Sequence, residues 1–151
     1  MCKHFVIVFI LFSLPAFASD AIEVRQDDRL NATLINDASV TLNETVNLLF
    51  DPQTLLSGDV ESVLPDYCLL AADAALNGTL LLLSPRNILC VTDQQQVLES
   101  VLSGFATVNG VAAVPFECAR RNANGCSEAR LAAGLTVDFT LTEPAILRSQ
   151  R

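Results

Sequence analysis

Histidine, lysine, methionine and tryptophan are all missing from the sequence after residue 18, although Lys3 and His4 stand near its start. Without histidine, this part of the chain has no Ser-His-Asp or Cys-His nucleophile and no imidazole ligand for a metal. Without lysine, it can form no Schiff base and has no phosphate-loop lysine. Carboxylates, arginines, hydroxyl groups and Tyr67 are what is left, and we expect the thiols to be oxidised. The sequence therefore predicts a protein that is not an enzyme and that carries no cofactor.

The first 18 residues have the pattern of a secretory signal peptide. Lys3 and His4 form a short basic start, an apolar run follows, and Ala16-Phe17-Ala18 fits an A-x-A cleavage site. We expect the mature chain to begin at Ser19 and to be exported to the periplasm, the outer membrane or the extracellular space. An uncleaved anchor is the alternative. No later stretch predicts a membrane span, because charged or turn residues interrupt every apolar run.

The chain after the predicted signal is strongly acidic. Eight arginines against 17 acidic residues leave a net charge of −9. Such a surface repels phosphate backbones and anionic lipids, so we expect no nucleic-acid partner. The spacing of Asp27, Asp28 and Asp37 matches no calcium loop, which predicts a solvated acidic face and no metal site.

Four cysteines follow the predicted signal: Cys68, Cys90, Cys118 and Cys126. An even count in an exported chain indicates disulfides, for which three connectivities are possible. We favour Cys68–Cys90 with Cys118–Cys126, because each pair closes a local loop. A zinc site made by all four is the alternative, but their spacing fits no common zinc ribbon.

Strand-like periodicity dominates the rest of the sequence. Apolar and polar residues alternate along 40–50 and 135–141, and Asn109-Gly110 is a two-residue hairpin signal. The spacing at 96–108 fits both a helix and a strand, and we favour one strand. Residues 127–133 are a candidate for one or two helical turns. Asp51-Pro52 and Ser84-Pro85 are expected to end or interrupt strands.

These patterns predict a mainly β fold: a small, disulfide-stabilised β-sandwich or β-barrel of about seven or eight short strands. We expect residues 19–29 to be a loose lead-in, in which residues 21–25 are a candidate edge strand. Residues 30–145 are expected to form a single β domain, and residues 146–151 a frayed tail.

Three sets of residues are candidates for contact or modification. Arg120 and Arg121, in the loop between two cysteines, suit an anionic partner. The strand at 135–141 is expected to be an exposed edge that docks a partner strand. Its candidate contact residues are Leu135, Val137, Phe139 and Leu141. If the source is eukaryotic, the sequons at Asn31, Asn43 and Asn77 are potential glycosylation sites.

The segment from Leu64 to Val111 carries a further pattern. Leu64-Pro65-Asp66-Tyr67 leads into Cys68, and an apolar stretch ends in Ile88-Leu89-Cys90. A Val/Glu-rich run, Val97 to Val101, is followed by Gly104 and then Gly110-Val111. This segment resembles part of the TraB-type channel scaffold proteins of conjugative type IV secretion systems. The resemblance implies a small β-barrel domain that joins an envelope-spanning assembly and has no catalytic residues. Those scaffolds also carry an inner-membrane helix and a long proline-rich segment, and neither pattern occurs here.

The leading hypothesis is an exported, non-enzymatic β domain that contacts other protein subunits in a bacterial envelope assembly. A secretion or conjugation apparatus and a pilus-like fibre are the settings we expect, with a homo-oligomer as one form of the assembly. The alternative is a soluble, secreted module that binds a carbohydrate or a small apolar molecule in the mouth of a barrel.

Overall fold

The computed structural model describes residues 21–149, and this range contains thirteen β-strands and no helix. The strands are β1 Ile22–Val24, β2 Arg29–Leu34, β3 Ala38–Thr41, β4 Thr45–Ser57, β5 Val60–Val63, β6 Tyr67–Leu76, β7 Leu81–Val91, β8 Val97–Val101, β9 Gly104–Thr107, β10 Glu117–Asn122, β11 Gly125–Leu131, β12 Thr136–Leu141 and β13 Ala145–Ser149. The prediction of a mainly β fold is confirmed, but the predicted count of seven or eight strands was too low. Among the described residues, no helix is available to cross a membrane.

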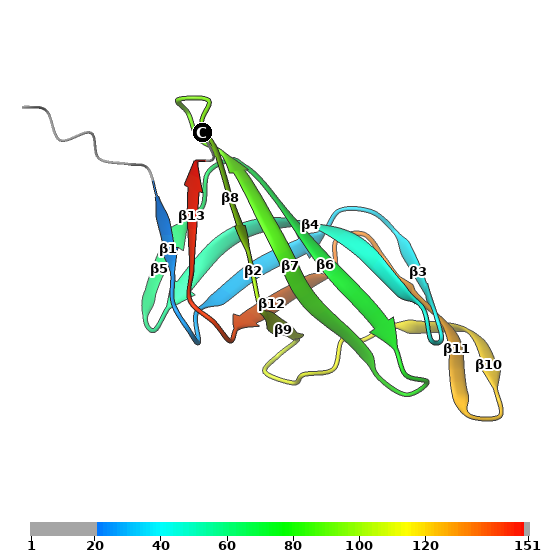
Figure 1. Cartoon of the computed structure of the whole chain (residues 1–151). Helices are drawn as coiled ribbons and strands as arrows, with labels where there is room; N and C mark the ends of the chain where they lie inside the picture. The colour runs from blue at the N-terminus through cyan, green and yellow to red at the C-terminus, as the bar shows by residue number, and fades with distance from the viewer. Residues whose placement is uncertain (1–20, 150–151) are drawn as a thin grey trace, which may run out of the picture.

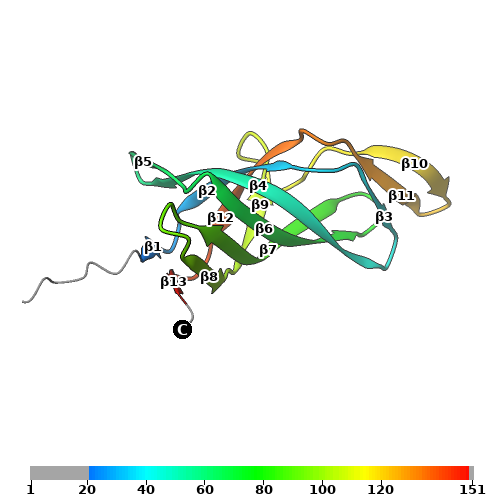
Figure 2. The ribbon, with the colours of Figure 1, turned by 90° about the horizontal axis from the view of Figure 1, so that it is seen from above.

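Ten of the strands form one antiparallel sheet, with the order β1-β13-β8-β7-β6-β4-β2-β12-β9 and with β5 paired to β4. The sheet curls, so that β9 comes back toward β7; between β8 and β9, the Leu102 N–H donates to the Arg86 carbonyl at 2.8 Å. The curled sheet forms a half-barrel. The other three strands, in the order β10-β11-β3, form a smaller sheet at one end of this half-barrel (Figures 1 and 2). The molecule is therefore elongated, with the small sheet at the end opposite to β1, β5 and β13.

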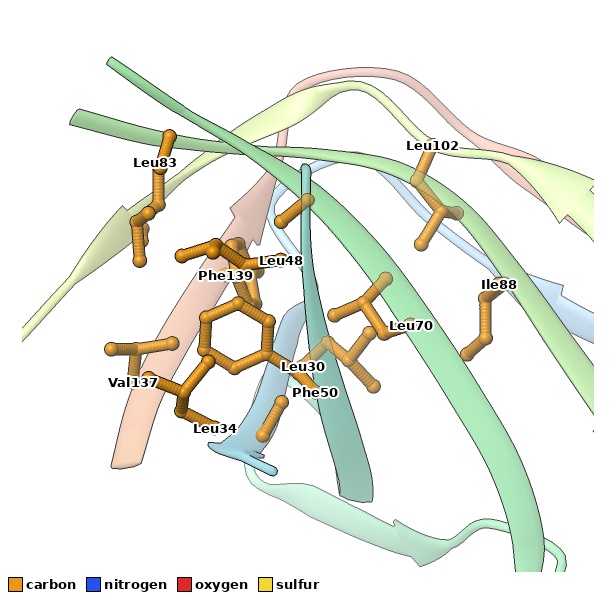
Figure 3. Close-up of a cluster of buried hydrophobic side chains, with 14 of the residues drawn as sticks. Leu30, Leu34, Leu48, Phe50, Leu70, Leu83, Ile88, Leu102, Val137 and Phe139 are labelled. Atoms are coloured by element: carbon orange, nitrogen blue, oxygen red, sulfur yellow. The ribbon is translucent and has the colours of Figure 1, made fainter. Parts of the chain in front are cut away.

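The concave side of the large sheet holds the core (Figure 3). Phe50 of β4 and Phe139 of β12 meet edge to face, with ring centroids 5.3 Å apart, and leucines of β2, β6 and β7 surround them. An apolar cavity between this core and β13 measures only about 10 Å³, roughly the space of one water molecule. Side chains therefore fill almost all of the space between this core and β13.

Two prolines that were expected to break strands lie inside long strands. Pro52 is part of β4, and the register between β2 and β4 shifts beside it, where Gln53 is the extra residue. Pro85 is part of β7, and the register with β6 shifts beside it in the same way. Proline donates no backbone hydrogen bond, and a bulge is a position in a sheet that tolerates this loss.

Other local predictions were wrong in detail. The stretch 96–108 forms two strands, β8 and β9, because the residue-by-residue pairing with β7 ends at Val101. The expected helical turns at 127–133 are instead strand β11, which lies between β10 and β3.

The two chain ends pair with each other. The candidate edge strand at 21–25 contains β1, which lies at the edge of the large sheet beside β13. The expectation of a frayed tail was wrong for residues 146–149, because β13 pairs with β1 and β8. The predicted signal peptide at 1–18 lies outside the described residues. Asn109 and Gly110 both have positive φ, so the predicted turn is confirmed, although only Val108 and Val111 pair across it.

The favoured disulfide pairing is confirmed. Cys68 and Cys90 are directly opposite each other on β6 and β7. Cys118 and Cys126 join β10 to β11, which belong to the small sheet. Each of the two sheets therefore contains one disulfide bridge that links two neighbouring strands. The two bridges indicate an oxidising, exported environment.

Candidate functional site

The predicted docking edge is an interior strand. β12 pairs with β2 on one side and β9 on the other. Val137, Phe139 and Leu141 are fully buried in the core, and Leu135 just before β12 is half-buried. The expectation that this strand is an exposed edge was therefore wrong, because alternation predicts a buried face but says nothing about neighbouring strands.

The other predicted contact residues, Arg120 and Arg121, lie on a strand with a free edge. β10 pairs with β11, and within the described range no strand pairs with its other side. Both arginines are exposed. The register with β11 shifts between Cys118 and Arg120 and again between Arg120 and Arg121. The free side of β10 thus presents unpaired backbone groups next to two cationic side chains.

A disulfide closes the β10–β11 hairpin, and a backbone hydrogen bond holds the hairpin against the large sheet. The Cys118–Cys126 bridge closes the hairpin, and the Cys126 N–H donates to the Gly78 carbonyl at 2.7 Å. Gly125 lies so close to Gly78 that an added Cβ would come within 2.6 Å of that same carbonyl oxygen. The hairpin is therefore fixed to the β6–β7 turn, and the free edge is presented on a rigid support.

An open groove of about 890 Å³ lies at the end of the small sheet, beside the start of β10. Its walls are 37–39 at the start of β3 and 115–117 leading into β10, and its floor is 130–135. The Asp37 carboxylate accepts a hydrogen bond from the Ala133 N–H at 2.8 Å, which fixes the turn after β11. Arg130 stands opposite Glu117 in the ladder, so both charges are carried at the groove rim.

The hairpin is a cationic spot on an acidic protein. It carries Arg120, Arg121 and Arg130 against two glutamates. Arg120 Nε lies 3.1 Å from Glu128 Oε2, but the arginine side chain is 79% exposed, so this pair is a weak, solvent-screened one. Within residues 21–149, no ion pair engages Arg121. The arginine side chains are therefore available to form ion pairs with anionic side chains of a partner.

The three sequons differ in how their asparagines are placed. Asn43 is exposed in the turn between β3 and β4, with φ of 64°. Asn31 lies within β2 and its Nδ2 donates to Asp138 Oδ1 at 2.8 Å, while Asn77 Oδ1 accepts from the Leu80 N–H at 2.9 Å. Only Asn43 therefore has a side chain that takes no part in a hydrogen bond among the described residues.

The described residues 21–149 contain no group of three or more His, Cys, Asp or Glu side chains placed to hold a metal ion. No protein-family model and no curated protein matches this chain.

The geometry of β10 indicates what this site can do: a rigid, free strand edge can pair with the backbone of an extended segment. The sequence pattern missed this edge, because the turn-rich run between Cys118 and Cys126 resembles a loop more than a strand.

Proposed function

We propose that this protein is an exported, non-enzymatic β domain that binds an extended segment of a protein partner along the free edge of β10. The observation that carries the proposal is the unpaired outer side of β10, anchored by a disulfide and flanked by Arg120 and Arg121. Strand addition draws its affinity from main-chain hydrogen bonds, so it requires no special side-chain constellation. This suits a chain without histidine or lysine after residue 18.

The arginines indicate the kind of segment that fits. An acidic strand would satisfy the cationic hairpin and would add charge-assisted contacts to the backbone pairing. The setting that we propose is an assembly in the bacterial envelope or outside the cell, such as a secretion or conjugation apparatus or a pilus-like fibre. The two disulfides and the predicted signal support export, and the resemblance to conjugation scaffolds supports the choice of assembly.

The alternative function is a ligand-binding module, and the open groove at 37–39, 115–117 and 130–135 favours it. Its volume of about 890 Å³ lies in the range of small-molecule sites. A small molecule retained on the monomer in native mass spectrometry would support this alternative against strand addition.

A photo-reactive benzoylphenylalanine at position 121, introduced in the native host, tests the proposed function. We expect ultraviolet light to join β10 covalently to its partner, and we expect backbone amides of 119–122 to exchange hydrogen more slowly in the complex than in the free protein. The same probe at position 86, which is exposed on the interior strand β7, is the matched control. Equal cross-linking from both positions, or unchanged exchange in β10, would show that this edge is not the binding site.

A further inference from the structure

A second free edge lies on β5. This strand pairs with β4 alone among the described strands, and all four of its residues are exposed. Val60 and Val63 are 65% and 82% exposed, although valine is a residue that usually packs inside a β protein. β5 thus extends the sheet without burying its own apolar side chains.

The charge of the β4–β5 hairpin is opposite to that of the β10–β11 hairpin. Asp59 in the turn and Glu61 on β5 are exposed, and no lysine or arginine occurs anywhere between Arg29 and Arg86. The other hairpin carries Arg120, Arg121 and Arg130. The edges of β5 and β10 are therefore complementary in charge as well as in backbone hydrogen-bonding capacity.

The two edges also lie at opposite ends of the molecule. Figures 1 and 2 place β5 near β1 and β13 at one end and β10 at the far end of the small sheet. β5 and β10 are therefore too far apart to pair with each other within one copy. A contact between one copy's β5 and another copy's β10 leaves a free β5 and a free β10 at the ends of the pair.

We propose that the partner strand for β10 is β5 of a second copy of this chain, so that the protein associates head to tail. This inference rests on the proposed function, because it names the segment that the β10 edge accepts. The four residues of β5 pair along the six residues of β10, and Glu61 comes to lie against Arg121. Val60 and Val63 lose their exposure to water against the neighbouring hairpin. Because each contact leaves the opposite ends free, association continues into an open chain.

Sedimentation velocity on the disulfide-bonded protein across a range of concentrations tests this inference. We expect weight-average mass to rise with concentration and to fall when salt is added, since salt screens the exposed charges. Glu61→Arg and Arg121→Glu each place like charges opposite one another, and each is expected to weaken association by about tenfold. Asp51→Arg and Arg86→Glu make the same charge changes at exposed positions on interior strands, and these control variants should associate as the unchanged protein does.

Mixing the two edge variants gives the decisive result. In an equimolar mixture, the arginine introduced at position 61 of one variant meets the glutamate introduced at position 121 of the other, and the unchanged Glu61 meets the unchanged Arg121. Association should therefore return to the level of the original protein, although each variant alone associates weakly. Circular dichroism of each variant checks that the fold is retained.

The outcomes separate the two proposals. Failure of the mixture to associate, or a protein that stays monomeric at every concentration, overturns head-to-tail self-association. If benzoylphenylalanine at position 121 then joins β10 to a different protein, the proposed function stands and only the identity of the partner was wrong. If position 121 joins to nothing, both are wrong, and the arginines and register shifts of β10 instead protect the edge from pairing.

Discussion

Two phenylalanines on neighbouring strands illustrate how one residue's position decides its role. Phe139 on β12 is fully buried and packs against Phe50, whereas Phe105 on the adjacent strand β9 is 42% exposed. Phe139 was a predicted contact residue, and its structural environment makes it a central part of the core. A substitution there acts on stability first and on binding only through the fold.

We expect Phe139→Ala to lower the free energy of unfolding by about 3–5 kcal/mol, because it removes a buried ring and leaves a cavity. Phe105→Ala is the matched control and should cost much less, since its ring already contacts water. Urea unfolding followed by circular dichroism measures both. Losses of equal size would mean that the Phe50–Phe139 contact contributes little to the core.

The two disulfide bridges stabilise different pairs of strands, and so different parts of the molecule. Cys68–Cys90 links the long strands β6 and β7, and 22 positions separate the two cysteines. Cys118–Cys126 links β10 to β11, with a separation of 8. The first bridge supports the half-barrel, and the second supports the hairpin that carries the proposed binding edge.

Removing the bridges one at a time should have different effects. Loop-closure entropy predicts a loss of about 3.4 kcal/mol for Cys68→Ala with Cys90→Ala, and about 2.6 kcal/mol for Cys118→Ala with Cys126→Ala. Guanidinium unfolding measures both losses. Hydrogen exchange should also show faster opening of β10 and β11 in the second variant while β6 stays protected. A larger loss from the shorter loop would contradict the entropy argument.

At the scale of the whole molecule, the C-terminal strands close the fold. β12 lies between β2 and β9, and β13 lies between β1 and β8, so both connect segments that are distant in sequence. Neither strand pairs with the strand that comes directly before or after it in the sequence. The half-barrel therefore depends on residues near the end of the described range.

A chain that ends at Gly134 should fail to fold, because it loses β12 and β13 together. Their loss leaves β1 and β9 without any partner strand, and β2 and β8 with one partner each. We expect loss of the β signal in circular dichroism and of cooperative thermal unfolding. Adding a peptide of residues 135–151 in trans is the control and should restore both signals. A truncated chain that folds by itself would show that β12 is dispensable.

The sequence alone determined the broad character of the protein. Alternating strands, paired cysteines and the Asn109-Gly110 turn are local patterns, and they correctly predicted a mainly β fold, the disulfide pairing and a turn with positive φ. The expectations of export, of a non-enzymatic role and of envelope partners also come from the sequence, through what it lacks, through its first 18 residues and through the resemblance at 64–111.

Only the tertiary structure decided which strands have free edges. Side chains project above and below a sheet, so their alternation in sequence reports burial of its faces. Backbone hydrogen bonds lie in the plane of the sheet, and their partners come from anywhere in the chain: Asp138 of β12 stands opposite Asn31 of β2. This is why the clean pattern at 135–141 was mistaken for an edge, while the turn-rich run at 118–126 held a strand with a free edge.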